Sequence, residues 1–270
     1  MTHPDKSQWR WRRAITDLVR GIEAWQVWSL LAYQDVRQRY VRSVLGEFWI
    51  SISLGISILS IGVLYGGIFD FPMESYLPYL AAGVAGWTLI SSALNEGSQA
   101  FIADHLLLLQ SSQPRSLYIF RVLLRTFIVF AHNQIIVLMV CVAFGVWPTW
   151  WLFTLIPNSL LVLVNVGWAA LLLAIVATRF RDIPPILGNV LQILFFLTPI
   201  IWKPEQVPDH LKLIVDLNPL KMLLELLRSP FLGTSLSIST YVSVVLLAVV
   251  GWLIAIALYA RTRHRIIYWL

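Results

Sequence analysis

Long apolar runs without charged residues dominate the chain. A membrane-spanning helix needs about 20 mostly apolar residues. Runs of this kind that lack Asp, Glu, Lys and Arg cover Phe48–Phe69, 76–95, 126–178, 183–202 and 234–260. The run 126–178 would be about 80 Å long as one helix, at about 1.5 Å per residue, so we expect two passes with a break at the Gly-, Pro- and Trp-containing stretch 145–151. The pattern predicts an all-α membrane protein with six transmembrane helices in a domain over residues 48–260.

Composition narrows the class further. Hydrophobic residues make up 58% of the 270 positions and charged residues only 13%, whereas soluble domains have about 25% charged residues. Soluble, disordered and nucleic-acid-binding proteins are therefore excluded. The single cysteine, Cys141, lies in an apolar run, so neither a disulfide nor a metal framework is expected. The first 47 residues show no signal-peptide pattern.

The positive charges predict the orientation of the chain in the membrane. The formal net charge is +6, and most Lys and Arg lie in residues 1–47, 96–125, 179–181 and 261–270. Four of the 20 fall on the opposite side, namely Lys203, Lys212, Lys221 and Arg228. Because Lys and Arg near helix ends stay in the cytoplasm, we expect a cytoplasmic N-terminal segment over 1–47, a basic cytoplasmic tail over 261–270, and both termini inside.

An amphipathic helix is expected just before the first span. If 32–46 is helical, one side gathers Tyr33, Val36, Tyr40 and Val44, and the other gathers Asp35, Gln38, Arg39 and Arg42. Such a helix lies in the membrane interface. Two interpretations stay open: a positive topology anchor, or a site where Arg37, Arg39 and Arg42 bind an anionic lipid headgroup through their guanidinium forks.

Two connections between the spans are more than plain loops. In 97–116, the leucines at 106–109 would form an unusual exposed apolar patch. This segment is therefore either the end of a tilted helix or a short helix that docks on a partner. The Ser-Ser-Gln-Pro that follows the leucines favours a separate helix. In 203–233, Asn218-Pro219 predicts a helix start and Ser229-Pro230 its end. That helix is expected to lie at the interface or re-enter the membrane, with a surface helix as the alternative.

Catalytic signatures are absent from the sequence. It contains no Gly-rich phosphate loop and no His, Cys or Glu set with metal-ligand spacing. His132 is the one ionisable side chain deep in the predicted spans, and with the amides of Asn158, Asn165, Asn189 and Gln192 it is expected to hydrogen-bond within the bundle. We therefore expect a transport subunit, not an enzyme, whose energy comes from another chain.

Three stretches resemble the permease subunits of ABC transporters that export polysaccharides such as O-antigen, capsule and teichoic acid. They are DVRQRYVRSVLGEFW at 35–49, RFRDI at 179–183 followed by QILFFLTPIIW at 192–202, and LNPL at 217–220 leading to ELLR at 225–228. Their order and spacing match the family over roughly residues 30–262. Two departures are a longer segment before Trp25 and Leu54 where such permeases often have a proline.

The resemblance implies a multi-pass protein of the bacterial inner membrane, part of lipopolysaccharide or capsule biosynthesis. It implies a homodimer with two copies of an ATP-binding subunit, which would hold ATP and Mg while this chain binds no cofactor. Coupling to that subunit would use Leu106, Leu107, Leu108, Gln110 and Pro114. An outer gate over 203–233 would include Asn218, Pro219, Glu225 and Arg228.

The implied substrate is a glycan on a polyprenyl pyrophosphate, whose headgroup would engage near Arg37, Arg39 and Arg42. Aromatic faces suit a sugar path, and the candidates are Trp49, Tyr65, Trp87, Phe195 and Phe196. Alternatives are an ABC permease for another amphiphile such as a drug or lipid, a glycan-modifying membrane enzyme, and a passive channel or secondary transporter.

Overall fold

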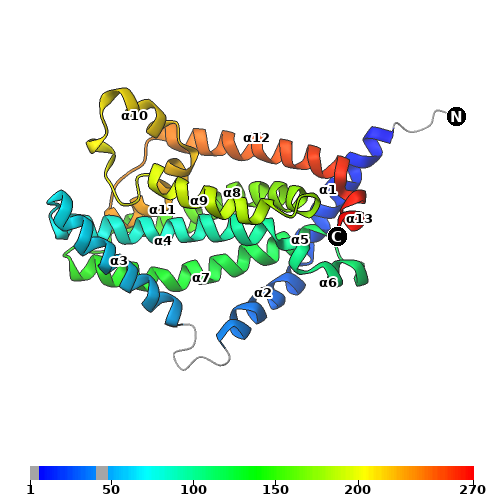
Figure 1. Ribbon diagram of the computed structural model, residues 1–270, viewed down its shortest axis with the longest axis horizontal. Coiled ribbons are helices and arrows are strands. Elements are labelled where there is room, and N and C mark those ends of the chain that lie inside the picture. The colour runs from blue at the N-terminus through cyan, green and yellow to red at the C-terminus, as the bar shows by residue number, and fades with distance from the viewer. Residues whose placement is uncertain (1–5, 41–47) are drawn as a thin grey trace.

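The protein is a helical bundle, seen in a computed structural model that describes residues 6–40 and 48–270 (Figure 1). Helix accounts for 86% of the described residues, which confirms the all-α class. The helices are α1 (Lys6–Glu23), α2 (Trp25–Tyr40), α3 (Phe48–Phe69), α4 (Met73–Ser98), α5 (Ala100–Ala103), α6 (His105–Gln110), α7 (Ser116–Ala143), η1 (Trp150–Thr154), α8 (Leu155–Arg179), α9 (Ile183–Leu197), η2 (Pro204–Gln206), α10 (Asp209–Asp216), α11 (Pro219–Leu232), α12 (Ile238–Thr262), η3 (Arg263–Arg265) and α13 (Ile266–Trp269).

The long helices run side by side, so the bundle has two distinct ends. We call the end that carries α1, α6, α13 and the C-terminus the basal end, and the end that carries α10 the apical end (Figure 1). Five helical segments in the described residues are long and apolar enough to cross a membrane: Ser51–Phe69, Met73–Ser98, Ser116–Ala143, Trp150–Arg179 and Ile238–Trp269. The predicted break within 126–178 is confirmed, because α7 ends at Ala143 and Gly145 takes a positive φ of 79°.

The predicted 20-residue span over 183–202 is wrong in its length, because the helix is shorter than the apolar run. The helix α9 ends at Leu197, and Thr198 takes an extended conformation with ψ 140°. The cause is Pro199, because a proline disfavours the helical conformation of the residue before it. At about 1.5 Å per residue, α9 is about 22 Å long, shorter than the roughly 30 Å hydrocarbon core. Five helical segments therefore have the length and composition of a complete span, and a sixth span remains a prediction.

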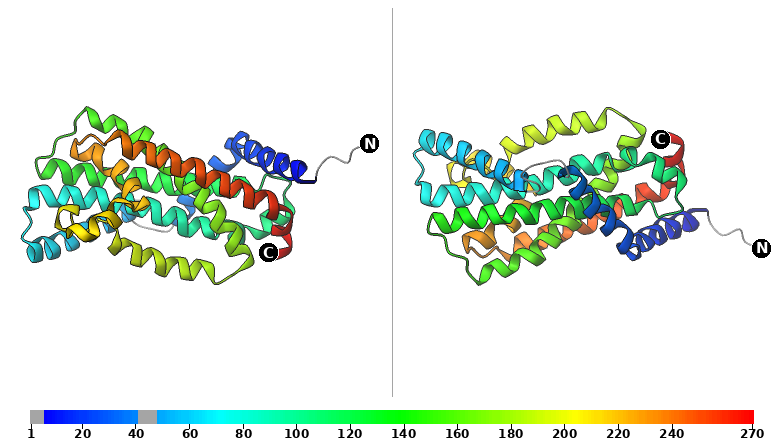
Figure 2. Two further views of the ribbon diagram at one scale, coloured as in Figure 1. Left: turned by 90° about the horizontal axis from the view of Figure 1, so that it is seen from above. Right: turned by 90° about the horizontal axis from the view of Figure 1, so that it is seen from below.

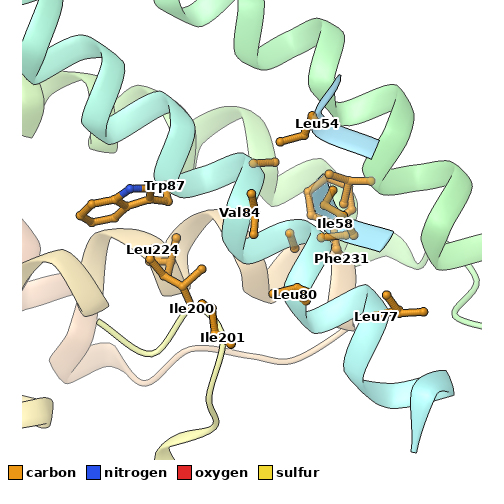
Figure 3. Close-up of a cluster of buried hydrophobic side chains, with 14 of the residues drawn as sticks. Leu54, Ile58, Leu77, Leu80, Val84, Trp87, Ile200, Ile201, Leu224 and Phe231 are labelled. Atoms are coloured by element: carbon orange, nitrogen blue, oxygen red, sulfur yellow. The ribbon is translucent and has the colours of Figure 1, made fainter. Parts of the chain in front are cut away.

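The helix α4 forms the centre of the bundle and contacts α3, α7, α8, α9 and α11. Its run of small residues, Ala81-Ala82-Gly83 and Ala85-Gly86, lets neighbouring helices approach closely. Leu80, Val84 and Trp87 of α4 pack in one cluster with side chains from α3, α11 and the turn after α9 (Figure 3). The position of α4 therefore determines how the apical turn and α11 sit on the bundle.

The two helices before the first span form an arm at the basal end. The helix α2 crosses over α7 and α1 continues beside the end of α12 (Figure 2). The predicted amphipathic division of this region is wrong at two positions: Asp35 faces the bundle beside the buried Val36, and Tyr33 is 57% exposed. Ion pairs of Asp35, described below, cause its inward position. The predicted residues 41–46 of that helix, including Arg42 and Val44, lie outside the described residues.

The segment between α9 and α12 contains the predicted short helices α10 and α11. Asn218 caps α11 as predicted, because its side chain accepts a hydrogen bond of 2.9 Å from the Leu220 N–H. The predicted end at Ser229-Pro230 is wrong, since α11 continues to Leu232. Pro230 leaves the Leu226 carbonyl without its helical donor, and the Asn158 amide of α8 donates to that carbonyl at 2.8 Å.

Close packing of α4 on α8 depends on Gly97, whose missing side chain leaves room for Ala170. We predict that Gly97→Leu destabilises the purified protein by about 1–3 kcal/mol, the usual cost of overpacking, seen as a lower midpoint of thermal unfolding. The matched control is Gly67→Leu in α3, because no atom lies within 4 Å of a side chain added there. Equal midpoints for the two variants would contradict the role of Gly97.

Candidate functional site

A cluster of ion pairs joins the arm to the bundle at the basal end. The Asp35 carboxylate of α2 accepts two hydrogen bonds from Arg121 of α7, at 2.8 Å from Nε and 2.6 Å from Nη2. It also accepts one from Arg125 Nη1 at 2.8 Å. A carboxylate held by paired guanidinium donors is among the stronger polar contacts in proteins, so Asp35 fixes α2 against α7.

The same arginines reach two further segments. Arg121 Nη1 lies 2.9 Å from Asp104, the residue before α6, and Arg125 Nη2 lies 2.6 Å from Glu96 on α4. Arg39 of α2 approaches Glu96 at 3.4 Å. This set, which we call the basal ion cluster, comprises Asp35, Arg39, Glu96, Asp104, Arg121 and Arg125. It connects the arm, the central helix, the short helix α6 and a membrane span.

The two aspartates of the basal ion cluster respond differently to their surroundings. Burial opposes ionisation of Asp35, but the hydrogen bonds and charges of Arg121 and Arg125 prevail and hold its pKa below the ordinary value. For Asp104, burial raises the pKa above the ordinary value despite the nearby Arg121, and the negative charge of Asp35 adds to this rise. Asp35 is therefore the anionic centre of the cluster.

The predicted headgroup residues are not equivalent. Arg39 belongs to the basal ion cluster through Glu96, whereas Arg37 is exposed on α2 and Arg42 lies outside the described residues. From the sequence, Asp35 was expected only on the polar side of the predicted helix, so its role in the basal ion cluster was missed. An acidic residue among the arginines at 35–42 was a signal for that role.

The predicted coupling segment contains a separate short helix, as the Ser-Ser-Gln-Pro stop favoured. On α6, Leu106, Leu107 and Leu109 are exposed, as is Gln110, whereas Leu108 is buried in the bundle. Pro114 follows in the turn before α7. Three exposed leucines on six residues form an apolar patch at the basal end, and Leu108 anchors it.

A second buried acid holds α1, in the segment that the sequence showed only as an N-terminal extension. Asp17 accepts hydrogen bonds from the Ser116 N–H at 3.1 Å, the Tyr259 hydroxyl at 2.7 Å and Arg263 Nη2 at 2.7 Å. Burial works against its charge, yet these donors and the charge of Arg263 lower its pKa. Asp17 therefore fastens the arm to the start of α7 and the end of α12.

At the apical end, the predicted gate residues surround the turn after α9. Arg228 of α11 is buried and donates to the Pro199 carbonyl at 2.9 Å, with its guanidinium 3.7 Å from the centre of the Tyr79 ring. The Tyr79 hydroxyl donates to the carbonyls of Pro199 and Trp202, each at 3.0 Å. These bonds satisfy carbonyl groups of the irregular turn that follows α9.

The remaining gate residues lie on the same helix. Asn218 donates to the Thr198 hydroxyl at 3.3 Å, and Pro219 occupies the first turn of α11. Glu225 lies 3.6 Å from Lys221, one turn away. The structure thus brings Asn218 and Arg228 together on the 198–202 turn, whereas Glu225 pairs along its own helix.

The aromatic candidates divide into two groups. Trp87 lies edge-on to Phe195 with ring centres 5.9 Å apart, and Phe195 contacts Phe196 at 5.4 Å. Tyr65 instead stacks on Phe69 near the apical end of α3, and Trp49 is exposed at the other end of that helix, about 24 Å away at about 1.5 Å per residue. The structure connects three of the five candidates.

The described residues contain no group of three His, Cys, Asp or Glu side chains placed to hold a metal. Five long apolar spans, a short exposed helix and buried charges at one end define the class of a multi-pass helical membrane protein. Residues 26–232 match the ABC-2 type transporter family. The chain belongs to this family, and it is a permease-type protein of the inner membrane.

Curated relatives carry a more specific name. The O-antigen export system permease protein RfbA of Myxococcus xanthus is 25% identical over 197 residues, covering 72% of this chain and 75% of the relative. Two proteins of the same name from Klebsiella pneumoniae are each 21% identical, over 232 residues (82% of this chain, 88% of the relative) and 244 residues (87% and 92%). The resemblance noted from the three motifs is confirmed.

We predict that Asp35→Asn destabilises the protein by about 3 kcal/mol, the lower value for breaking a buried ion pair, because Arg121 and Arg125 lose their shared partner. The expected readouts are a lower thermal midpoint and faster protease cleavage at Arg37. The control is Asp182→Asn, which changes an exposed acid in the loop before α9. This variant is expected to leave the thermal midpoint and the rate of protease cleavage unchanged.

The same variant tests the pKa of Asp35. A lowered pKa in the folded state means that the stabilisation is complete above the unfolded value of about 3.9 and is lost as the pH falls through the folded value. We expect the wild-type midpoint to fall more steeply below about pH 4 than that of Asp35→Asn. Parallel curves would show that Asp35 is not held as an anion.

Proposed function

We propose that this chain is the membrane subunit of an ATP-driven exporter that moves lipid-linked polysaccharide of the O-antigen or capsule type across the inner membrane. The observation that carries the proposal is the likeness to O-antigen export permeases over most of the chain. Membership of the ABC-2 family implies an ABC ATP-binding partner. The ATP and Mg sites are assigned to that partner.

The basal end is assigned to the cytoplasm. Arg121, Arg125 and the arm lie there, as does the C-terminus (Figure 1), and Lys and Arg near helix ends stay on the cytoplasmic side. The arm, formed by α1 and α2, then lies at the cytoplasmic surface. In this orientation α10 and α11 lie toward the periplasm, where the 198–202 turn and Arg228 form the outer gate.

The leucines of α6 are assigned to the ATP-binding subunit. An exposed apolar face on a short helix fits a groove on a partner, and α6 is connected through Asp104 and Arg121 to α2 and α7. A displacement of α6 is therefore transmitted to the span α7 and to the arm. Gln110 and Pro114 belong to the same surface.

A second copy of the chain is assigned to the side of the bundle formed by α3 and α9. Both helices flank α4 on one side of the molecule (Figure 2). Their outward residues, such as Ile56 and Ile193, are large, apolar and exposed. In a homodimer these faces enclose a path between the copies, and the connected rings of Trp87, Phe195 and Phe196 lie on α4 and α9 beside it.

The substrate assignment has two chemical parts. Arg37 lies on α2 of the arm and Arg42 follows five residues later in the sequence. Their guanidinium forks suit the pyrophosphate of a polyprenyl-linked glycan. Aromatic rings suit the passing sugars, because the C–H faces of sugars stack on them without sequence-specific hydrogen bonds. Export of another amphiphile is the competing function, and the experiment below distinguishes it.

The test uses the full chain with the ATP-binding subunit that co-purifies with it, in liposomes. We expect pyrophosphate-linked glycan to stimulate ATP hydrolysis and to be transported, and the chain alone to move nothing. Stimulation by small amphiphiles but not by glycan would identify a permease for a drug or lipid. Flux through the chain alone would contradict the need for a partner, and glycan modification without ATP would indicate an enzyme.

We predict that Leu107→Asp abolishes coupled transport and releases the ATP-binding subunit, because a charge cannot enter an apolar groove without a partner. Co-purification and ATP-dependent transport are the measurements. The control is Ile267→Asp, a similarly exposed apolar position on α13 at the same end. Normal coupling in Leu107→Asp, or equal loss in both variants, would contradict the assignment of α6.

We predict that cysteines at Ile56 and Ile193 form a cross-linked dimer with a short bifunctional reagent in membranes. The native Cys141 is buried, so it contributes little background cross-linking. In the control, the second cysteine is moved to Leu246 of α12, which is 57% exposed, as is Ile56. Dimer in the control but not in the test pair would place the second copy on α12.

A further inference from the structure

The helix α1 separates apolar from basic side chains. Ala14, Asp17 and Gly21 pack on the bundle. One flank of the helix is apolar and exposed, with Trp11, Ile15, Val19 and Ile22. Arg13 and Arg20 share the opposite flank, because residues seven apart lie on the same face of a helix. The apolar flank suits the surface of a bilayer, so the basic flank is the one that faces away from lipid.

A polar hollow of about 250 Å³ lies between this basic flank and the start of α7. We call it the arginine hollow, and its lining residues are Arg13, Thr16, Asp17, Arg20, Ser112, Gln113, Pro114 and Arg263. A neighbouring hollow of about 270 Å³ is lined by Arg10, Arg13, Ala260, Arg263 and His264. The two hollows share two arginines, so they form one basic surface over α1 and the end of α12.

The acid in the arginine hollow is already paired. Among the described residues that line it, Asp17 is the one carboxylate, and its side chain is 1% exposed. Arg263 donates to it at 3.1 Å from Nε and 2.7 Å from Nη2, in addition to the bonds from Ser116 and Tyr259. Arg13 and Arg20 are exposed. The positive charge of the hollow therefore exceeds its negative charge.

A further arginine lies next to the paired acid. The backbone N–H of Arg115 is 3.3 Å from the Asp17 carboxylate, and its Nη1 atom is buried with no hydrogen-bond partner among the described residues. Burial lowers the pKa of Arg115, and the charge of Arg263 adds to this effect, while Tyr259 and Asp17 oppose it. One more negative charge at the arginine hollow would stabilise this excess of guanidinium groups.

The size of the arginine hollow restricts what it can hold. Its volume of about 250 Å³ is below the roughly 300–1,000 Å³ of small-molecule sites. It therefore matches one or two side chains better than a nucleotide or a cofactor. Guanidinium groups form short, charge-assisted hydrogen bonds with carboxylates, so the complementary group is an Asp or Glu side chain of another protein.

The arginine hollow is continuous with the surface assigned to the ATP-binding subunit. Ser112, Gln113 and Pro114 line the hollow and directly follow α6, which ends at Gln110. The Cα atoms of Gln110 and Ser112 are at most about 7 Å apart, because the chain spans no more than about 3.6 Å per residue. Both surfaces lie at the basal end (Figure 1). A partner that contacts the leucines of α6 therefore also lies beside the hollow.

We infer that the arginine hollow is a second docking point for the ATP-binding subunit and takes an acidic segment of that subunit. The inference rests on the proposed function, and it adds a contact outside the family match, which begins at residue 26. The helix α6 is connected to α7 and α2 through Asp104 and Arg121. The arginine hollow is connected to α12 through Asp17 and Arg263, so this contact delivers movement to a span that the basal ion cluster does not include.

The first test identifies the molecule at the hollow, in membranes that contain the full chain and the ATP-binding subunit that co-purifies with it. Arg20→Lys keeps the charge and introduces an amine, which a zero-length carbodiimide joins to a carboxylate in direct contact. We expect a cross-link between the two subunits above the wild-type background, located by mass spectrometry at an Asp or Glu of the ATP-binding subunit.

The matched control for cross-linking is Arg12→Lys, which lies on the same helix but lines neither hollow. No link to the ATP-binding subunit is expected from this position. A link from Arg20→Lys to a second copy of the chain would identify a contact between copies and overturn the inference. Equal links from both variants, or none above background, would overturn it as well.

The second test measures the affinity between the purified subunits. We expect Arg20→Gln to weaken binding by about fivefold at low salt, the upper range for an exposed ion pair, and Arg20→Glu to weaken it further. The difference from wild type shrinks as salt screens the charges. Changing the cross-linked acid of the partner to arginine restores binding to Arg20→Glu, which a merely structural role of Arg20 does not explain.

The control for affinity is Arg12→Gln, which leaves binding unchanged, and thermal midpoints close to wild type confirm that the variants are folded. Release of the ATP-binding subunit by Leu107→Asp, together with full affinity in Arg20→Gln and Arg20→Glu, would overturn the docking point and leave coupling through α6 intact. If the wild-type chain binds no ATP-binding subunit, the proposed function is wrong and the docking point is wrong with it.

Discussion

The cost of placing charge next to a membrane governs this structure. Arg121 and Arg125 lie on a membrane-spanning helix, and each must find a carboxylate because an unpaired buried charge costs several kcal/mol. Asp35 satisfies both, which brings α2 across α7. Glu96 and Asp104 complete the pairing and fix the central helix and α6 to the same point. The arm, the coupling candidate and the spans therefore share one electrostatic anchor.

The same rule appears at the other buried polar positions. Asp17 is surrounded by donors from α7 and α12, and Arg228 by a carbonyl and the Tyr79 ring. Asn158 donates to the carbonyl that Pro230 deprives of its helical partner. In each case a polar group in an apolar setting is paired with a group distant in sequence. These pairings position the parts that a transporter needs to move.

The exposed surfaces of the bundle define how the chain contacts other molecules. Apolar faces on α3 and α9 point toward lipid or a second copy, the leucines of α6 point out at the basal end, and α1 carries both apolar and cationic faces. The helix α6 combines an apolar patch at the basal end with a direct tie to the ion cluster through Asp104. This connection is the physical reason to assign it the coupling role.

The sequence alone determined the helical membrane class, five of the spans, the separate short helix at 105–110 and the cap at Asn218, because these depend on local hydropathy and on residues two or three apart. It did not reveal that Asp35 faces inward, that α9 ends at Leu197, or that α1 docks through Asp17. The positions of Asp35 and Asp17 depend on partners 86 to 246 residues away. The end of α9 instead follows from Pro199, a local signal that the hydropathy pattern alone overlooks. Only the tertiary structure decides which charges meet, because pairing is settled by the packing of the helices.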